Sequence, residues 1–185
     1  MSPRVAYQGV PGAFGEEACR RFLPDHEPIA LASFNAVAEA VLTGEAELGM
    51  LPQANSTAGP VPGIEALLED GRLAVRASHQ LPVRLHLMAR PGVALDEVTT
   101  VVSHPVALGQ CVRFLAESGL AAEEADNTAM AAQALAVEAG RTRAAVASEA
   151  AAAAYGLTIL IRDVHDRADN ATTFCIVARS EGSEA

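Results

Sequence analysis

Short apolar runs alternate with helix-like segments along almost the whole chain of 185 residues, and glycine- and proline-rich turns separate them, as at 9–15 and 59–63. This alternation is typical of α/β proteins, in which helices cover a largely parallel sheet. Only 4% of the residues are aromatic and none is Trp, so Ala, Val and Leu must build the core. Such small side chains suit close packing of helices on a parallel sheet. We therefore predict an α/β fold.

The order of the expected elements divides the chain into two halves. The first half reads as strands at 4–8, 29–31, 47–51 and 73–76 with helices at 16–22, 34–42 and 64–68, and a further strand is expected at 84–88, beyond the crossing to the second half. Ser33 is the expected N-cap of the helix at 34–42, and Gly44 is its expected C-cap. The second half reads as strands at 98–102, 121–125, 144–147 and 158–161 with helices at 106–117 and 128–138 and a third helix through the alanine run to Ala154. A last strand at 173–178 precedes a polar tail at 180–185.

This order predicts two α/β lobes with a central cleft. The chain is expected to cross near Gln80 and to return near residue 163, so that 1–79 plus 163–185 form the first lobe and 80–162 the second. Clefts between lobes are favoured ligand sites. We therefore expect the functional residues to line such a cleft.

Charge and composition narrow the class of ligand. A net charge of −10 argues against a nucleic-acid partner, whereas helix N-termini could still bind a small anion. The three cysteines and five histidines show no disulfide, zinc or other metal pattern. No segment is apolar and long enough for a membrane. The sequence thus predicts a cytoplasmic protein without a metal site and leaves a small anionic ligand possible.

Several polar segments stand where a strand is expected to meet a helix or loop. They are Pro52–Gly59, with Asn55 and Ser56; Ser103-His104-Pro105, followed by Gln110; Asp126-Asn127-Thr128; and Asn170 to Phe174, with two threonines just before the last strand. Ligands often bind at the carboxyl ends of strands in open α/β sheets. The same residues could also be ordinary helix caps, loop residues or strand formers. Local sequence leaves both interpretations open.

The ordered set of motifs resembles prephenate and arogenate dehydratases. The motifs are residues 6–14 (Ala-Tyr-Gln-Gly-Val-Pro-Gly-Ala-Phe), Pro52 with Asn55-Ser56 and Gly59, Ser103-His104-Pro105 with Ala107-Leu108 and Gln110-Cys111, Thr128-Ala129, Ala147-Ser148 with residues 153–157, and Asn170 with Thr172 and Phe174. The similarity runs in order from Arg4 to Arg179. The opening motif is especially similar to plant arogenate dehydratases.

The resemblance implies a function and a set of site residues. It implies decarboxylation and dehydration of prephenate to phenylpyruvate in L-phenylalanine biosynthesis, without a metal or organic cofactor, in a periplasmic-binding-protein-like (type II) fold assembled as a homodimer or a dimer of dimers. Thr172 would be the catalytic residue, at the leaving hydroxyl. The substrate-binding residues implied by the match are Gly12, Ala13, Phe14, Asn55, Ser56, Ser103, His104, Gln110, Thr128, Ala129, Thr173 and Phe174.

Three positions depart from the family pattern. Ala54 stands where the family has Glu, Val106 where it usually has Gln, and Thr173 where it has Arg. A guanidinium at position 173 could pair with a carboxylate, so its loss would weaken substrate affinity. The family also commonly carries a C-terminal ACT domain that binds phenylalanine. The chain stops after the catalytic unit, so we expect no phenylalanine inhibition through this polypeptide alone.

Three other functions are compatible with the same motifs. One is arogenate dehydration, because arogenate and prephenate share the ring and differ in the side chain. Another is prephenate decarboxylation with retention of the hydroxyl, although such relatives tend to lose both the Asn-Ser and the Thr-x-Phe motifs, which are kept here at Asn55, Ser56, Thr172 and Phe174. The third is a non-catalytic binding module, since fold alone does not determine function.

Overall fold

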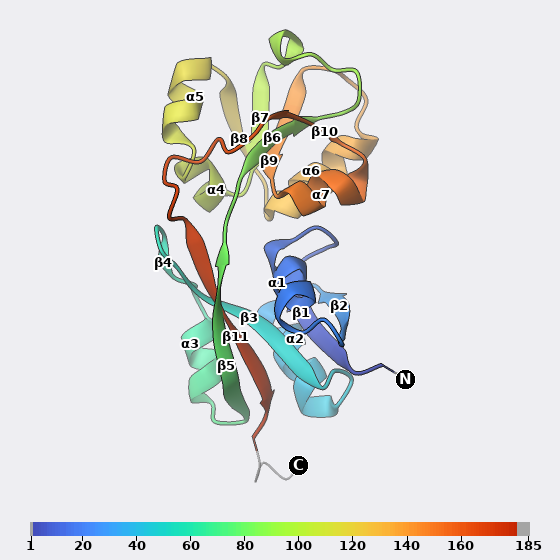
Figure 1. Ribbon diagram of the computed structural model, residues 1–185, viewed down its shortest axis with the longest axis vertical. Coiled ribbons are helices and arrows are strands. Elements are labelled where there is room, and N and C mark those ends of the chain that lie inside the picture. The colour runs from blue at the N-terminus through green and yellow to red at the C-terminus, as the bar shows by residue number, and fades with distance from the viewer. Residues whose placement is uncertain (1, 181–185) are drawn as a thin grey trace. The chain divides into compact units, whose positions relative to one another are not determined.

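The computed structural model describes residues 2–180, and contacts divide these residues into two units (Figure 1). The first unit holds 2–10, 14–82 and 170–180, and the second holds 11–13 and 83–169. From the sequence, residues 80–82 are expected in the second lobe, and residues 11–13 and 163–169 in the first. Residues 80–82 belong to the first unit because β5 continues through Pro82. The segment after residue 162 stays with the second unit, where the Val164 amide donates a hydrogen bond to the Leu85 carbonyl.

The first unit is built on a sheet with the strand order β2-β1-β3-β11-β5. Its strands are β1 (Arg4–Gln8), β2 (Glu27–Leu31), β3 (Leu48–Asn55), β5 (Leu73–Pro82) and β11 (Ala171–Arg179), and the short β4 (Gly59–Pro60) pairs with β3. β1 runs parallel to both β2 and β3. The last strand, β11, inserts antiparallel between β3 and β5, so the end of the chain completes the centre of the sheet.

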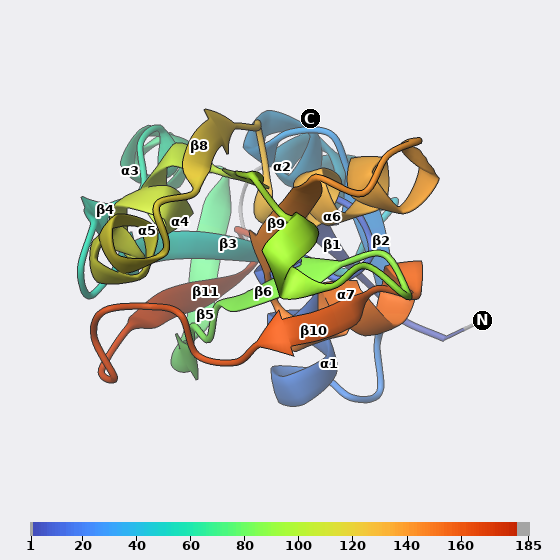
Figure 2. The ribbon, with the colours of Figure 1, turned by 90° about the horizontal axis from the view of Figure 1, so that it is seen from above.

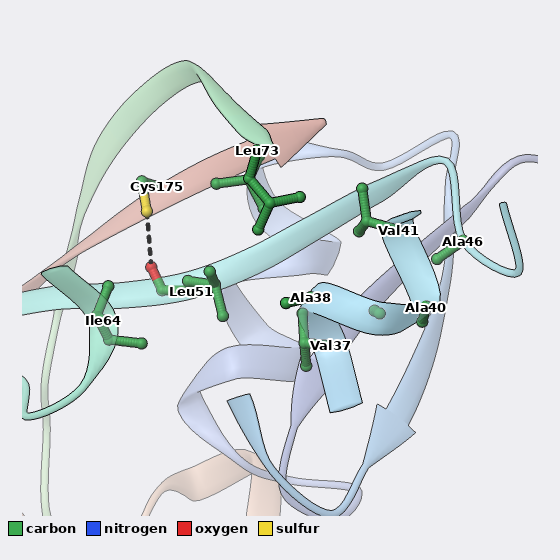
Figure 3. Close-up of a cluster of buried hydrophobic side chains, with 11 residues drawn as sticks. Val37, Ala38, Ala40, Val41, Ala46, Leu51, Ile64, Leu73 and Cys175 are labelled. Atoms are coloured by element: carbon green, nitrogen blue, oxygen red, sulfur yellow. Dashed lines mark hydrogen bonds between the residues drawn. The ribbon is translucent and has the colours of Figure 1, made fainter. Parts of the chain in front are cut away.

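Helices α1 (Phe14–Phe22), α2 (Phe34–Thr43) and α3 (Ile64–Glu69) belong to this unit. As expected, Ser33 caps α2 by accepting a hydrogen bond from the Ala36 amide, and Gly44 ends the helix with a φ of 78°. The core on the α2 face is made mainly of aliphatic side chains (Figure 3), with Val37 and Val41 against Leu51 and Val177. Gly49 on β3 is packed against these valines, and a Cβ at this position would lie only 2.9 Å from Val177 Cγ2. Small residues therefore let α2 approach the sheet closely.

The second unit has a sheet of its own with the strand order β10-β6-β9-β7-β8. Its elements are β6 (His86–Ala89), the 3-10 helix η1 (Leu95–Glu97), β7 (Thr100–Ser103), α4 (Pro105–Gly109), α5 (Val112–Ser118), β8 (Ala121–Glu124), α6 (Thr128–Val137), β9 (Arg143–Ala147), α7 (Glu149–Tyr155) and β10 (Thr158–Ile161). β7 is parallel to β8 and β9, whereas β6 is antiparallel to β9 and β10 (Figure 2). The turns after β7 and β8 therefore leave the same edge of the sheet.

The observed elements differ most clearly from the expected ones in four places. β3 continues to Asn55, β5 continues past Arg76 to Pro82, and β11 already begins at Ala171. β11 pairs along both neighbours, which extends all three strands beyond their apolar cores. The single helix expected at 106–117 is two helices, because Asp166 accepts hydrogen bonds from the first two amides of α5.

Of the helices described between residues 2 and 180, none combines the length and the hydropathy needed to cross a bilayer.

The polar tail expected at 180–185 lies outside the described residues except for Ser180, whose amide donates to the Arg72 carbonyl.

Candidate active site

Thr172 lies inside β11, an interior strand of the first unit's sheet, and is paired directly with Asn55. In the ladder it stands opposite Asn55 on β3 and opposite Leu81 on β5. Its side chain is buried, with 9% of the residue exposed. The sequence analysis placed Thr172 just before the last strand, whereas the structure places it within that strand and next to a residue 117 positions earlier. The ladder therefore brings two of the expected site residues together.

A β-bulge at Gln53 turns Asn55 toward Thr172. Phe174 pairs with Pro52 and Thr173 pairs with Ala54, so Gln53 is the extra residue on β3. Successive side chains of a strand point to opposite faces, and one inserted residue reverses that alternation. Without the bulge, Asn55 would share the face of Leu51, which is packed in the aliphatic core. The bulge instead places the Asn55 amide on the face that carries Thr172.

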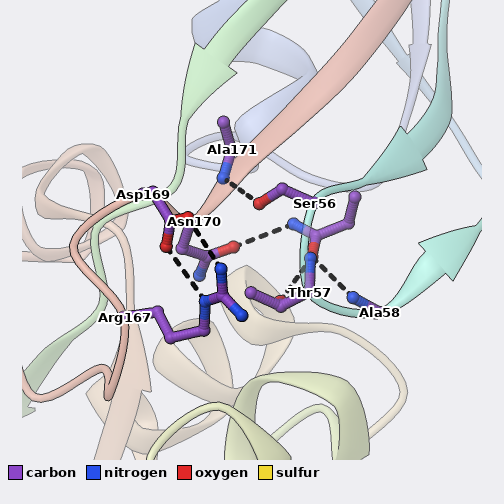
Figure 4. A network of polar contacts seen from close by, with 8 residues as sticks. Ser56, Thr57, Ala58, Arg167, Asp169, Asn170 and Ala171 are labelled. Carbon is purple, nitrogen blue, oxygen red and sulfur yellow. Dashed lines mark hydrogen bonds and ion pairs between the residues drawn. The ribbon is translucent and has the colours of Figure 1, made fainter.

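The side-chain amide of Asn55 is held at both ends, and Figure 4 labels three of its partners, Thr57, Ala58 and Asn170. Its Oδ1 accepts hydrogen bonds from the Thr57 amide at 2.9 Å, the Thr57 hydroxyl at 2.6 Å and the Ala58 amide at 3.0 Å. Three donors around this atom identify it as the oxygen, so the nitrogen must face the other way. Nδ2 donates to Asn170 Oδ1 at 3.0 Å and to Thr172 Oγ1 at 3.1 Å.

This arrangement makes the Thr172 hydroxyl a hydrogen-bond donor for a ligand. A hydroxyl has one hydrogen and two acceptor lone pairs. Thr172 Oγ1 accepts from Asn55, and among residues 2–180 the hydroxyl donates no hydrogen bond of its own. A buried hydroxyl with this polarity can donate to an oxygen brought against it. Its high pKa makes it a neutral donor, suited to a leaving hydroxyl group.

Ser56 closes the end of the same ladder. Its amide donates to the Ala171 carbonyl at 2.8 Å, and its Oγ accepts from the Ala171 amide at 3.0 Å. These two bonds join β11 to the turn that holds Asn55. Figure 4 shows this pair and, in the second unit, the ion pair between Arg167 and Asp169, whose atoms are 2.7 Å apart.

The other expected residues of the first unit lie elsewhere. Thr173 is half-buried on the opposite face of β11 from Thr172, since the two are adjacent in one strand. Phe174 is 3% exposed and packs in the interior. Phe14 begins α1 and is half-buried. The structure therefore groups Thr172 with Asn55, and with Ser56 through the backbone of Ala171, but does not group it with Thr173.

In the second unit, Ser103 and His104 stand at the end of β7. Ser103 is fully buried, and its Oγ donates to the Val146 carbonyl at 2.6 Å, which ties β7 to β9. His104 is the N-cap of α4, and its Nδ1 accepts from the Val106 amide at 3.2 Å. Because Nδ1 accepts this bond, it contributes to the cap of α4.

Three further expected residues of this unit lie at helix ends. Gln110 is the C-cap of α4, and its carbonyl accepts from the Asp166 amide at 2.7 Å. Thr128 is half-buried at the first position of α6, and Ala129 beside it is fully buried. Asn127 caps this helix, accepting from the Ala129 amide at 2.8 Å. The amides of this helix start are thus partly satisfied within the chain.

Gly12 and Ala13 form a loop that is held on α7. Gly12 has a φ of 84°, and a Cβ there would lie 2.5 Å from the Ala151 Cα. Its carbonyl accepts from Ser148 Oγ at 2.7 Å, and the Tyr155 hydroxyl donates to the Pro11 carbonyl at 2.8 Å. Only glycine fits at position 12, because the backbone is left-handed and in contact with the helix.

The sequence analysis did not include Ser148, Tyr155 or Asn170 among the site residues. Ser148 and Asn170 were visible as polar residues between a strand and its neighbour, but their partners lie 136 and 115 positions away. Neither local pattern nor spacing shows such a contact. The family motifs did contain all three.

The cysteines do not offer a nucleophile. Burial raises the pKa of Cys19 and of Cys111 to about 12, and it also raises the pKa of Cys175. All three thiols are therefore protonated near neutral pH and poorly reactive. In the part of the chain that the structure describes, no group of three or more His, Cys, Asp or Glu side chains is placed to hold a metal ion.

Comparisons with known proteins identify the family. A family model described as "Prephenate dehydratase" matches residues 5–182. The chain is similar to arogenate dehydratase/prephenate dehydratase 2 of Arabidopsis thaliana, with 40% identity over 95% of this chain and 46% of the relative. It is also similar to a bifunctional N-acyl-homoserine lactone acylase/prephenate dehydratase of Komagataeibacter europaeus, with 38% identity over 95% of this chain and 62% of the relative. The chain thus spans between about half and two thirds of these relatives.

Solved structures support the same assignment. The prephenate dehydratase of Arthrobacter aurescens, solved in complex with L-Phe, matches with a TM-score of 0.85 and 27% identity over 97% of this chain and 61% of that one. A periplasmic substrate-binding protein of an ABC transporter from Coxiella burnetii matches with a TM-score of 0.50 and 14% identity over 95% of this chain and 84% of that one. The latter likeness concerns the fold alone and confirms the predicted α/β, periplasmic-binding-protein-like class. The chain belongs to the prephenate dehydratase family.

Proposed function

We propose that the chain catalyses the conversion of prephenate to phenylpyruvate, carbon dioxide and water, a step of L-phenylalanine biosynthesis. The observation that carries this proposal is the buried Thr172 hydroxyl, which accepts from Asn55 Nδ2 at 3.1 Å and keeps its hydrogen for a ligand. The family assignment supplies the reaction class.

The reaction requires few catalytic groups from the protein. Loss of the ring carboxylate as carbon dioxide leaves its electron pair in the ring, and the ring hydroxyl departs from the opposite carbon, so that the ring becomes aromatic. One proton must be taken up for the leaving oxygen to depart as water. The Thr172 hydroxyl stabilises the charge that develops on this oxygen by donating a hydrogen bond, a neutral interaction that strengthens in the transition state.

A second candidate substrate is arogenate, which carries an amine where prephenate has a keto group. The names of several relatives favour it, including arogenate dehydratase 1 of Petunia hybrida, which is 42% identical over 95% of this chain and 42% of the relative. The reacting ring is the same in both substrates, so Thr172 would play the same part. The side chain of the substrate, remote from the leaving hydroxyl, would decide the preference.

The test is to incubate the purified chain with prephenate and, separately, with arogenate and to identify the products. Formation of phenylpyruvate or phenylalanine, with release of carbon dioxide, supports the proposal, and the ratio of kcat/KM values assigns the preferred substrate. A non-aromatic keto acid formed without phenylpyruvate would instead show decarboxylation with retention of the hydroxyl. Thermal stabilisation by prephenate without any product would show a binding module.

We also propose a compartment and an oligomeric state for the enzyme. All three cysteines are free and buried, which suits a reducing compartment such as the cytoplasm. We also propose a homodimer, and light scattering on the purified chain tests it: a monomer mass at working concentration would contradict this part.

A further inference from the structure

Asn170 lies immediately before β11 and is buried, with 3% of the residue exposed. Its Oδ1 accepts a hydrogen bond from Asn55 Nδ2 at 3.0 Å. The side chains of Asn170 and Thr172 therefore take the two hydrogens of one amide nitrogen. Asn170 belongs to no part of the proposed chemistry so far, yet it contacts the residue that contacts Thr172.

The Asn55 amide is planar, so its orientation is defined once both ends are held. The turn at Thr57 and Ala58 holds the oxygen, and Asn170 holds one hydrogen of the nitrogen. The remaining hydrogen must then point in one direction, where Thr172 Oγ1 lies at 3.1 Å. Rotation of the amide would break bonds at both ends and leave their donors and acceptors without partners, which is unfavourable for polar groups shielded from water.

The donor from Asn55 in turn constrains the Thr172 hydroxyl. With one lone pair engaged, the hydroxyl hydrogen cannot point at Asn55 and is left for a ligand. If the Asn55 amide were free to turn, its oxygen could face Thr172 and accept that hydrogen instead. The hydroxyl would then be an acceptor toward the substrate and could not stabilise a leaving oxygen.

We propose that Asn170 is a positioning residue that acts through Asn55 to keep Thr172 a hydrogen-bond donor toward the leaving hydroxyl; this inference rests on the proposed function. Asn55 has both of its amide hydrogens engaged within the chain. Through that nitrogen, Asn55 therefore links Asn170 to Thr172.

The kinetic test is a double-mutant cycle with Asn170→Ala, Asn55→Ala and the combination of both. Asn170→Ala should lower kcat about 10- to 100-fold with less than a threefold change in KM, because the lost interaction acts in the transition state. In the Asn55→Ala background the same change should alter kcat less than twofold, because the residue through which Asn170 acts is gone. Equal losses in the two backgrounds would overturn the proposal.

A second readout does not depend on activity. In ¹⁵N–¹H spectra of the side-chain amides, Asn170→Ala should shift one of the two Asn55 hydrogens and speed its exchange with solvent, while the signals of exposed Asn35 stay unchanged. Unchanged Asn55 signals would refute the contact. Asn35→Ala is the matched control for kinetics and melting temperature. If the unaltered chain turns over neither substrate, the proposed function fails, and the spectra alone decide whether Asn170 orients Asn55.

Discussion

The two units use polar residues in opposite ways. In the first unit, Asn55 donates hydrogen bonds to both Asn170 and Thr172 on and beside paired strands, where a β-bulge determines the face on which Asn55 lies. In the second unit, His104, Asn127 and Ser148 stand at strand-to-helix turns and cap helices with the same atoms that a ligand would use.

The difference distinguishes residues that can act on a ligand from residues that stabilise the backbone. A helix cap stabilises the backbone and has its acceptor occupied, so it contributes to a site mainly by setting where the helix begins. A hydroxyl on a strand with an occupied lone pair and an unengaged hydrogen can act on a ligand. We therefore expect substitutions in the first unit to affect turnover and those in the second unit to affect stability.

The largest expected effect is at Thr172. Thr172→Ala should lower kcat by about 10²–10⁴-fold, the usual contribution of a group that assists a leaving atom, with the melting temperature little changed. Thr172→Ser keeps the hydroxyl and should retain far more activity. Steady-state kinetics with prephenate measures both variants. Equal turnover by the alanine variant and the unaltered chain would contradict the assignment of the reactive group to the first unit.

Gly12 offers the next largest effect, and it concerns stability in the second unit. Gly12→Ala forces a left-handed alanine, costing about 1–2 kcal/mol, and drives its Cβ to 2.5 Å from the Ala151 Cα, which adds about 1–3 kcal/mol of overpacking. Gly44→Ala is the matched control, since its φ of 78° is similar and nothing lies within 4 Å. Chemical denaturation should show the larger loss for Gly12→Ala; equal losses would show that the loop can move off α7.

A smaller loss is expected on removal of a helix cap. Asn127 accepts hydrogen bonds from the Ala129 and Met130 amides at the start of α6. Asn127→Ala should lower the free energy of unfolding by about 1 kcal/mol, as is typical for a lost N-cap. Denaturant titration measures this loss, and Asn127→Ser, which can still cap, should recover most of it. A fall in kcat with unchanged stability would contradict the supporting role of the second unit.

The smallest expected effect depends on pH and on His86. Burial lowers the pKa of His86 below 6.5; Asp163 and Glu149 oppose this shift, while Arg162 and His165 add to it. Nδ1 accepts from the Asp163 amide at 3.0 Å. The folded state therefore takes up a proton less readily than the unfolded state, so stability should fall as the pH drops below 6.5.

His86→Asn keeps an acceptor near Nδ1 but cannot be protonated. Denaturation midpoints at pH 7.5, 6.5 and 5.5 should therefore decline less for this variant than for the unaltered chain. Parallel declines would assign the pH dependence to other groups.

The α/β class, the caps of α2 and the bounds of β1 and β10 follow from local patterns, because turns, caps and apolar runs are encoded by residues close together in the chain. The choice of Thr172 came from the ordered motifs, which preserve family information but carry no geometry. The break between α4 and α5 did not follow from local sequence, since Asp166, more than fifty positions away, caps the second helix.

By itself, the sequence determined which residue types are present at each turn and the family to which the chain belongs. Only the tertiary structure decided that Asn55 faces Thr172 and that Thr173 lies on the other face of β11. It also decided that Asn170 accepts a hydrogen bond from Asn55. The physical reason is strand pairing. One extra residue at Gln53 reverses the facing of everything that follows, and its effect is defined only by the partner strand that arrives more than a hundred residues later.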